Sequence, residues 1–257
     1  MYFKCLIFLS IATLVSAGRI PGPEERIIGG HSIPIEYVPW QVSLQGKETH
    51  NCGGAIYSDR AIVTAAHCIF EIRVEGLSIR AGSSHWSKGG QLVNVLKAVY
   101  HPLYDNKTFF NDIGVLILES PLKFNNHVQK IALADKSPVG GTMSLVSGWG
   151  YTREDAAYSW PTLQGVHVAI LNHTECENAY IKSKITEDMI CADGIGRDSC
   201  RTDSGGPLVS IRDRNLIGIV SWGEGCGRNP GVYADVAFFR DWINDKIEEY
   251  ITYTDNK

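Results

Sequence analysis

Short apolar or alternating runs recur along the chain, and they limit its fold more than any other feature. Residues 41–45 alternate strictly between polar and apolar side chains. Val166, Val168 and Ile170 share one face of a later run. Similar runs cover residues 61–64, 93–99, 113–118, 145–146, 208–209 and 216–220. Turn residues separate the runs at fairly regular intervals, so the sequence predicts an all-β fold, a sandwich or a barrel.

Two helices are expected beside the strands. A C-terminal helix is predicted over about 236–251, because apolar residues recur there at steps of three and four: Val236, Phe239, Trp242, Ile243, Ile247, Tyr250 and Ile251. A short helix is predicted to begin near Asn172, where Glu175 three residues on completes a capping-box pattern. Both are expected to serve packing rather than chemistry.

The N-terminus has the pattern of a secretory signal peptide. Lys4 supplies a positive charge, an apolar run extends from Cys5 to Val15, and Ala17 is a small residue suited to cleavage. The alternative, a membrane anchor, needs roughly 20 apolar residues, far more than this run provides. We therefore expect residues 1–17 to be removed from a secreted, extracellular, monomeric protein with no membrane partner.

The cysteine count fits an oxidising compartment. The chain has seven cysteines, of which Cys5 leaves with the signal peptide, and the remaining six predict a disulfide framework. Six cysteines can pair in about 15 ways, and their spacing alone does not choose among these. The absence of a CxxC pair argues against structural zinc, and the net charge of -4 argues against a nucleic-acid partner.

Residues 18–26 form a short leader that ends in Arg26, directly before Ile27–Gly30 (IIGG). A basic residue before such an apolar stretch is a plausible proteolytic site. The alternative is a flexible leader without a role. Cleavage there would leave residues 27–257 as the mature domain.

The stretch with the most chemical content is Cys200–Leu208 (CRTDSGGPL). Small, turn-forming residues around Ser204 can hold its hydroxyl on an exposed backbone kink, where nearby amide groups face a substrate carbonyl. An ordinary Gly-Gly-Pro turn is the alternative. As a nucleophile, Ser204 would need a base, and the base would need a partner that fixes its tautomer.

One histidine and one aspartate stand in suitable contexts. His67 follows the apolar run 61–66, and Asp112 precedes the apolar strand 113–118. Taken alone, His67 could be a satisfied buried histidine and Asp112 a strand-start turn residue. The other histidines lie in polar or turn-rich stretches, or on the polar face of a strand, and are expected to be solvated: His31, His50, His85, His101, His127, His173 and His167.

Together these motifs resemble the chymotrypsin/trypsin family of serine proteases over about residues 26–245. The resemblance is carried by Thr64–Cys68 (TAAHC), Asn111–Ile113 (NDI), Asp203–Leu208 (DSGGPL), Ile27–Gly30 and Ser221–Gly223 (SWG). The chain order His67, Asp112, Ser204 belongs to this group, whereas subtilisins and α/β-hydrolases order the same groups differently.

The resemblance implies two packed six-stranded antiparallel β-barrels, at about 27–127 and 128–235, followed by the C-terminal helix. His67, Asp112 and Ser204 would be base, orienting acid and nucleophile, and the N–H groups of Thr202 and Ser204 would form the oxyanion hole. The implied disulfides are Cys52–Cys68, Cys176–Cys191 and Cys200–Cys226.

The resemblance also assigns a specificity pocket and an activation switch. Asp198 would lie at the base of the pocket and select Arg or Lys, although it could also be a solvated loop residue. The pocket and the substrate-binding strand would be lined by Ser199, Ser221, Trp222, Gly223 and Gly231. Cleavage after Arg26 would release the Ile27 ammonium, which would pair with Asp203 and order the pocket.

Three features depart from or add to the family pattern. Thr202 stands where the family has glycine. Threonine keeps the backbone N–H, but its branched side chain crowds the leaving-group side of the site. Residues 80–92 contain no Asp or Glu, so no calcium is expected there. No other metal and no cofactor is expected. Asn106 and Asn172 begin glycosylation sequons, with an unmodified surface loop or a helix-cap role as the alternatives.

The sequence is therefore read as a secreted, zymogen-activated, trypsin-like serine endopeptidase that cleaves after Arg or Lys. Its expected partners are protein or peptide substrates, an activating protease that could be the enzyme itself, and protein protease inhibitors. The alternative interpretation is a non-catalytic family member that binds proteins, and Thr202 is the only feature that favours it.

Overall fold

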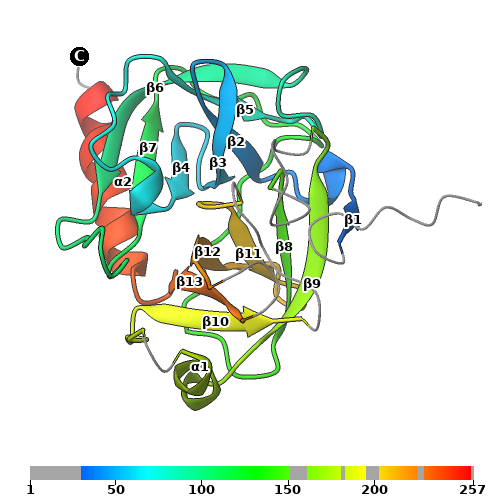
Figure 1. The fold of residues 1–257 in the computed structure, drawn as a ribbon. Helices are drawn as coiled ribbons and strands as arrows, with labels where there is room; N and C mark the ends of the chain where they lie inside the picture. Colours follow the sequence, from blue (N-terminus) through cyan, green and yellow to red (C-terminus); the bar gives the residue numbers. More distant parts are fainter. Residues whose placement is uncertain (1–29, 151–160, 181–182, 195–202, 225–228, 256–257) are drawn as a thin grey trace, which may run out of the picture.

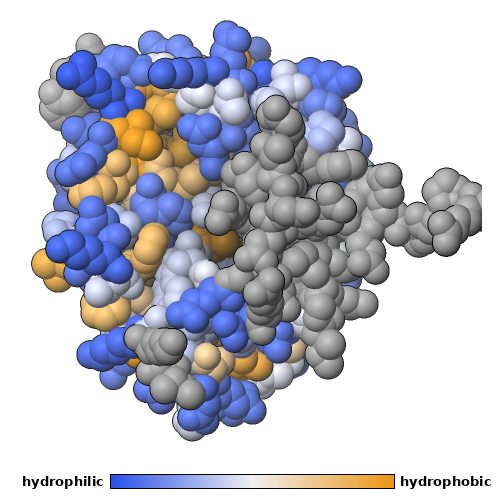
Figure 2. All heavy atoms as spheres, viewed as in Figure 1, coloured by the Kyte–Doolittle hydropathy of each residue, from blue (hydrophilic) through white to orange (hydrophobic). Residues whose placement is uncertain are grey.

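The computed structural model describes residues 30–150, 161–180, 183–194, 203–224 and 229–255. Its elements form two β-barrels with a helix at the C-terminus (Figure 1). In this part of the chain, no helix has both the length and the apolar character needed to cross a membrane. Hydrophilic side chains cover most of the described surface on the face shown in Figure 2, although a group of hydrophobic ones remains exposed there.

The first barrel closes in the strand order β2-β3-β4-β7-β6-β5. Its strands are β2 (Gln41–Gly46), β3 (Thr49–Ile56), β4 (Ala61–Thr64), β5 (Leu77–Ala81), β6 (Gln91–Tyr100) and β7 (Gly114–Leu118). In β5, Leu77, Ile79 and Ala81 are buried while the residues between them are partly exposed, as an alternating strand requires. In contrast, β7 is buried at every position, so its continuous apolar run lies in the interior.

The second barrel contains the other six long strands, all antiparallel to their neighbours. They are β8 (Met143–Gly148), β9 (Gln164–Ile170), β10 (Met189–Asp193), β11 (Pro207–Ser210), β12 (Leu216–Trp222) and β13 (Gly231–Asp235). The sheet order β9-β10-β13-β12-β11-β8 closes because β9 also pairs with β8, and β1 (His31–Ser32) adds to β9. The fold of two six-stranded barrels is thus confirmed.

The capping-box prediction is confirmed and the start of the C-terminal helix is corrected. Helix α1 (His173–Ala179) has reciprocal bonds between Asn172 and Glu175. Helix α2 (Arg240–Asp255) begins at Arg240 rather than near residue 236. The reason is a turn, in which the Ala237 N–H donates to Asp235 Oδ1 at 2.9 Å and holds the backbone out of the helix.

One hydrophobic cluster joins the two barrels, and the second barrel also has a core cluster of its own, which includes Val146, Val166 and Tyr233. A single cluster of buried side chains includes Val42 and Ile117 of the first barrel together with Leu216 and Ile219 of the second. Helix α2 packs into the same cluster through Ile243 and Ile247, beside β7 (Figure 1). The junction between the barrels is therefore a packed interior, and groups that meet there are held on rigid strands.

Candidate active site

Strand register brings His67 and Asp112 to the same end of the first barrel. In the antiparallel pair β4–β7, Thr64 lies opposite Gly114. His67 comes three residues after Thr64, in the 3₁₀ turn Ala66–Cys68, and Asp112 comes two residues before Gly114. The last residues of one strand and the first of its antiparallel partner share an edge, so the two side chains are neighbours.

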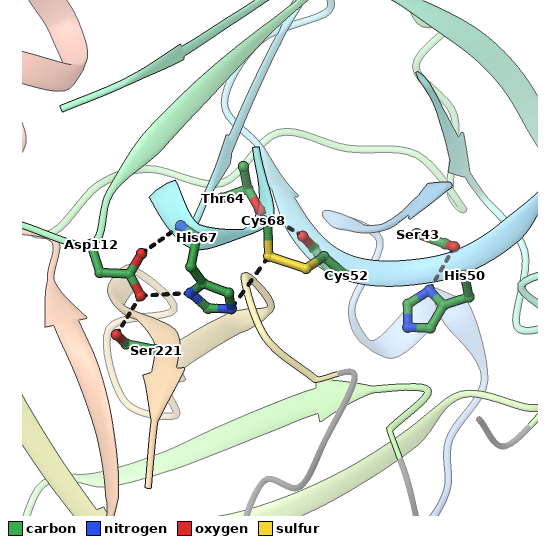
Figure 3. The surroundings of a disulfide bond; sticks show 9 residues. Ser43, His50, Cys52, Thr64, His67, Cys68, Asp112 and Ser221 are labelled. Carbon is green, nitrogen blue, oxygen red and sulfur yellow. Dashed lines mark hydrogen bonds and ion pairs between the residues drawn. A yellow bond between two sulfur atoms is a disulfide. The ribbon is translucent and has the colours of Figure 1, made fainter. Parts of the chain in front are cut away.

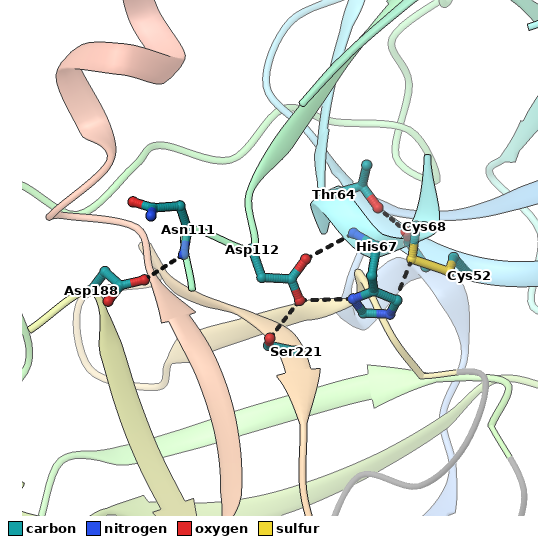
Figure 4. A network of polar contacts seen from close by, with 9 residues as sticks. Cys52, Thr64, His67, Cys68, Asn111, Asp112, Asp188 and Ser221 are labelled. Carbon is teal, nitrogen blue, oxygen red and sulfur yellow. Dashed lines mark hydrogen bonds and ion pairs between the residues drawn. A yellow bond between two sulfur atoms is a disulfide. The ribbon is translucent and has the colours of Figure 1, made fainter. Parts of the chain in front are cut away.

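The Asp112 carboxylate receives three hydrogen bonds (Figure 4). Oδ1 accepts the backbone N–H of His67 at 2.8 Å, and Oδ2 accepts His67 Nδ1 at 2.7 Å and the Ser221 hydroxyl at 2.5 Å. Asp112 is 1% exposed and has therefore lost its hydration, and these three donors replace the hydrogen bonds that water would make to the carboxylate.

This arrangement fixes the tautomer of His67. A carboxylate can only accept, so Nδ1 carries the proton and Nε2 presents its lone pair. The His67 side chain is 20% exposed, whereas Asp112 behind it is covered. The Phe109 ring lies edge-on to the imidazole, with centroids 5.7 Å apart. Such a histidine can accept a proton at Nε2 from a neighbouring hydroxyl.

A disulfide ties this histidine to the next strand (Figure 3). Cys68 is bonded to Cys52 of β3, and the Cys68 sulfur lies 3.7 Å from His67 Nε2. Among the residues that the structure describes, Cys52, His67 and Cys68 are the one group whose possible ligand atoms could surround a metal ion. Because both sulfurs are in the disulfide, they offer no thiolate to a metal.

The loop that carries Ser204 is bonded to the same part of the first barrel. The Ser204 carbonyl accepts the Gly53 N–H of β3 at 2.7 Å, and the Gly53 carbonyl accepts the Thr64 hydroxyl at 2.9 Å. Gly205 has φ of 76°, and a Cβ on it would lie 2.3 Å from Thr64 Oγ1. Glycine is therefore required at 205. The Ser204 loop contacts Thr64, the last residue of β4, which precedes His67 by three positions.

Asp203 is enclosed by backbone. It is 0% exposed, and its Oδ1 accepts the Gly150 N–H at 2.8 Å. A Cβ at Gly148 or Gly150 would lie 2.1 Å and 2.2 Å from the Asp203 carboxylate oxygens. Side chains at Gly148, the last residue of β8, or at Gly150 would overlap the carboxylate, so both positions require glycine for Asp203 to lie here.

The substrate-binding residues predicted on β12 and β13 lie together. Gly223 and Gly231 face each other, since a Cβ at Gly223 would be 4.0 Å from the Gly231 Cα. Trp222 packs edge-on against Tyr180, with ring centroids 4.9 Å apart. Ser221, predicted beside the substrate, gives its hydroxyl to Asp112 instead of leaving it free.

Several predicted residues lie outside the described residues: Arg26, Ile27, Asp198, Ser199, Cys200, Thr202 and Cys226. The Cys52–Cys68 and Cys176–Cys191 disulfides are present. Asn106 is exposed, and Asn172 uses its Oδ1 as the α1 cap, which leaves its Nδ2 uncommitted by that bond.

One histidine prediction was wrong, and another holds only in part, because His101 is half-buried with its ring against Phe239 and Trp242. His50 was expected to be solvated, but it is buried, with Nδ1 2.8 Å from the Ser43 hydroxyl and its ring near Trp86 and Trp149. Its neighbours in sequence are polar, whereas β3 turns this side chain toward the interior. His167 is exposed, as predicted.

The site also includes residues that sequence reasoning missed. Gly53, Thr64, Gly148, Gly150 and Phe109 contact the predicted groups or their loops. A glycine pair inside a strand, as at positions 53–54, was an available signal for close backbone approach. Nothing local marked Phe109, because its contact with His67 depends on the tertiary fold.

Comparisons with known proteins agree with this geometry. The Trypsin family model matches residues 27–243. The chain is 46% identical over 250 residues to trypsin beta of Drosophila erecta, which covers 93% of this chain and 98% of the relative. It is 43% identical over 250 residues to trypsin alpha of Drosophila melanogaster (93% and 96% covered), and 42% identical over 243 residues to trypsin alpha-4 of Lucilia cuprina (93% and 94% covered).

Proposed function

Because the chain belongs to the trypsin family of serine endopeptidases, we propose that it is secreted as a zymogen and cleaves peptide bonds after Arg or Lys. The observation that carries this proposal is the Asp112–His67 pair, in which a buried, fully bonded carboxylate fixes a partly exposed imidazole. Asp112, His67 and Ser204 act as a catalytic unit only if the Ser204 hydroxyl is the nucleophile. Reaction of the Ser204 hydroxyl with a fluorophosphonate after cleavage at Arg26, detected by mass spectrometry, tests this directly.

In the proposed reaction, Ser204 Oγ forms a bond to the substrate carbonyl carbon while His67 Nε2 takes the hydroxyl proton. The imidazolium then gives this proton to the leaving amine nitrogen as the peptide C–N bond breaks, which leaves an acyl-enzyme. A water molecule repeats the cycle on the ester, with His67 as base and then as acid. Asp112 stabilises the imidazolium and keeps its own charge.

The negative charge on the carbonyl oxygen needs donors. In the Ser204 loop, the N–H of Gly205 already donates to the Val220 carbonyl at 2.8 Å and that of Gly206 to the Asp203 carbonyl at 2.8 Å. These two groups are therefore committed to the fold. This supports the assignment of the oxyanion hole to the N–H groups of Ser204 and Thr202, which a threonine side chain leaves intact.

Selection of basic substrates is assigned to Asp198, with Ser199 beside it and Gly223 and Gly231 as open walls. A buried carboxylate at the pocket base requires a cation, which an Arg or Lys side chain supplies. Neither glycine places a side chain in the space beside it, which supports their assignment as pocket walls. Cys200–Cys226 would hold the nucleophile loop to this pocket.

Asp198→Ser should remove the preference for Arg and Lys. Truncating one partner of a buried charge pair costs about 2–5 kcal/mol, which would appear as a lower kcat/KM on Arg peptides. Matched peptides with Arg, Lys or Phe before the scissile bond measure the effect. The control is Glu224→Ser, which removes an exposed carboxylate next to Gly223 in the sequence. An unchanged ratio of Arg to Phe cleavage would show that Asp198 does not set specificity.

Asn106→Gln should raise activity on folded proteins severalfold more than on short peptides. We propose that Asn106 carries a glycan, because it is exposed at the start of the loop whose Phe109 contacts His67. A glycan there would hinder large substrates, since they extend beyond the cleft. Casein and a tripeptide amide are compared for the variant, the wild type and Asn172→Gln, whose sequon lies on α1. Bare Asn106 in secreted wild-type protein, seen by mass spectrometry, would refute the premise.

A further inference from the structure

We propose that Asp188 is a positioning residue for the reaction, because it holds the turn that aims the Asp112 carboxylate at His67. This inference rests on the proposed function and concerns the same site. Asp188 belongs to the second barrel, in the turn before β10, whereas Asp112 belongs to the first. No motif in the sequence joins them.

The turn around Asp112 is unusual in its backbone. Asn111 has φ of 57°, in the left-handed region, which asparagine adopts more readily than most other non-glycine residues. The Ile113 N–H donates to the Asn111 carbonyl at 2.8 Å, which closes a three-residue turn with Asp112 at its centre. Asparagine tolerates this conformation, and hydrogen bonds from neighbouring elements select it over the other conformations open to the residue. The direction of the Asp112 side chain therefore depends on what holds Asn111.

Asp188 provides that support from the other barrel. Its Oδ2 accepts the Asn111 backbone N–H at 2.8 Å, and its Oδ1 accepts the Thr186 hydroxyl at 2.5 Å. It is 7% exposed, and its backbone carbonyl accepts the Asp235 N–H at 2.8 Å, so the carboxylate has little freedom to move. A second contact, from Asn111 Nδ2 to the Leu103 carbonyl at 3.0 Å, fixes the other side of the residue.

The charges around Asp188 make its bond to Asn111 important. Buried Asp235, whose pKa is raised by burial, interacts unfavourably with the Asp188 charge, and His101, whose pKa is lowered by burial, lies within electrostatic range of it. A buried carboxylate needs donors. The Asn111 N–H is one of them, and a hydrogen bond to a charged acceptor is stronger than one to a neutral acceptor.

The geometry gives Asp112 two anchors in the second barrel. Ser221 of β12 donates directly to its Oδ2, and Asp188 holds the preceding residue (Figure 4). His67 is carried by the first barrel. The pair of anchors thus sets where Asp112 stands relative to His67 across the junction of the barrels, and a shift of this turn would misalign the imidazole.

The experiment compares Asp188→Ala, Asp188→Asn, Asp188→Glu and Glu187→Ala in the enzyme after activation by cleavage at Arg26. The measurements are kcat and KM on an Arg tripeptide amide, the inhibition constant of benzamidine and the melting temperature. The Ala variant should lose roughly ten- to a hundredfold in kcat, because displacement of a catalytic group by about 1 Å can cost that much. KM and benzamidine binding should stay within about twofold of wild type, since neither depends on proton transfer.

The other variants separate positioning from charge and from folding. Asp188→Asn should recover most of the loss, because its amide oxygen can accept from Asn111 while its amide nitrogen donates to Thr186. Asp188→Glu keeps the charge but moves the acceptor by one methylene, and should lower kcat even if the Ala variant does not fold. Glu187→Ala removes the exposed neighbouring carboxylate and should change nothing.

An unchanged kcat in the Ala and Glu variants would overturn the inference. So would equal losses in the Ala and Asn variants, or a loss of benzamidine binding as large as the loss of kcat, which would mean general loosening. If wild-type enzyme neither hydrolyses the amide nor reacts at Ser204, the proposed function itself fails. If the wild type is active and the Asp188 variants have the same kcat as the wild type, only the positioning role of Asp188 is refuted.

Discussion

Asp112→Asn should lower kcat by about 10⁴, the loss typical of serine proteases whose triad aspartate becomes an amide. The structure gives the reason. Donors occupy both oxygens of Asp112: His67 N on Oδ1, and His67 Nδ1 with Ser221 Oγ on Oδ2. An amide nitrogen at either position would therefore oppose a donor. With the nitrogen toward the ring, Nδ1 must lose its proton and Nε2 must carry one, which is the wrong tautomer for a base.

The matched control for this substitution is Ser221→Ala. It removes one of the three donors but leaves both His67 bonds intact, so it should cost far less than Asp112→Asn. Hydrolysis of an Arg tripeptide amide gives kcat, and benzamidine binding shows that the pocket remains formed. A loss in Asp112→Asn no larger than that in Ser221→Ala would mean that Asp112 does not fix the histidine tautomer.

Arg26→Gln should keep the precursor almost inactive after treatment with immobilised trypsin. We propose that activity requires the Ile27 ammonium to pair with Asp203. Asp203 is fully buried, with Gly148 and Gly150 leaving room for its carboxylate, so its charge must be satisfied within the protein. Losing one partner of a buried pair costs about 3–5 kcal/mol, or roughly 10²–10⁴ in the population of the ordered site.

The control for activation is Arg26→Lys, which keeps a basic residue at the cleavage point and should activate normally. Amidase activity before and after treatment is measured, and mass spectrometry identifies the new N-terminus. Full activity of Arg26→Gln with no terminus at Ile27 would contradict the switch. Cleavage at Ile27 in Arg26→Lys without a gain in activity would contradict it from the other side.

The strands that could be predicted from sequence are those with a clear pattern, and the missed ones show why others could not. Strands β2, β4, β7 and β12 have alternating or continuous apolar runs, and nearly every position in them is buried. Strand β3 contains Gly53 and Gly54, which lower strand propensity. It forms because β2 and β4 pair with it on both sides. Gly53 is needed where the Ser204 loop approaches, and Gly54 is needed where the side chains of Ile62 and Val42 pack against the strand.

The sequence by itself determined which groups are present, their order along the chain and the local structure around them. The α1 capping box, the Gly-rich turn after Ser204 and the apolar runs that flank His67 and Asp112 all follow from neighbouring residues. Local interactions act within a few residues, so such features can be found without a fold. The buried state of His50 was mispredicted because it depends on Trp86 and Trp149, which are distant in sequence. The start of α2 was mispredicted because the apolar pattern continues through the turn after Asp235.

Only the tertiary structure decided which of these groups meet. His67 and Asp112 are 45 positions apart, Ser221 and Asp112 are 109 apart, and Asp188 and Asn111 are 77 apart. Strand register places the first pair at one barrel edge, and packing between the barrels brings the other two across the junction. The physical reason is that such contacts are selected by the burial of a common core, a property of the whole chain that no local pattern contains.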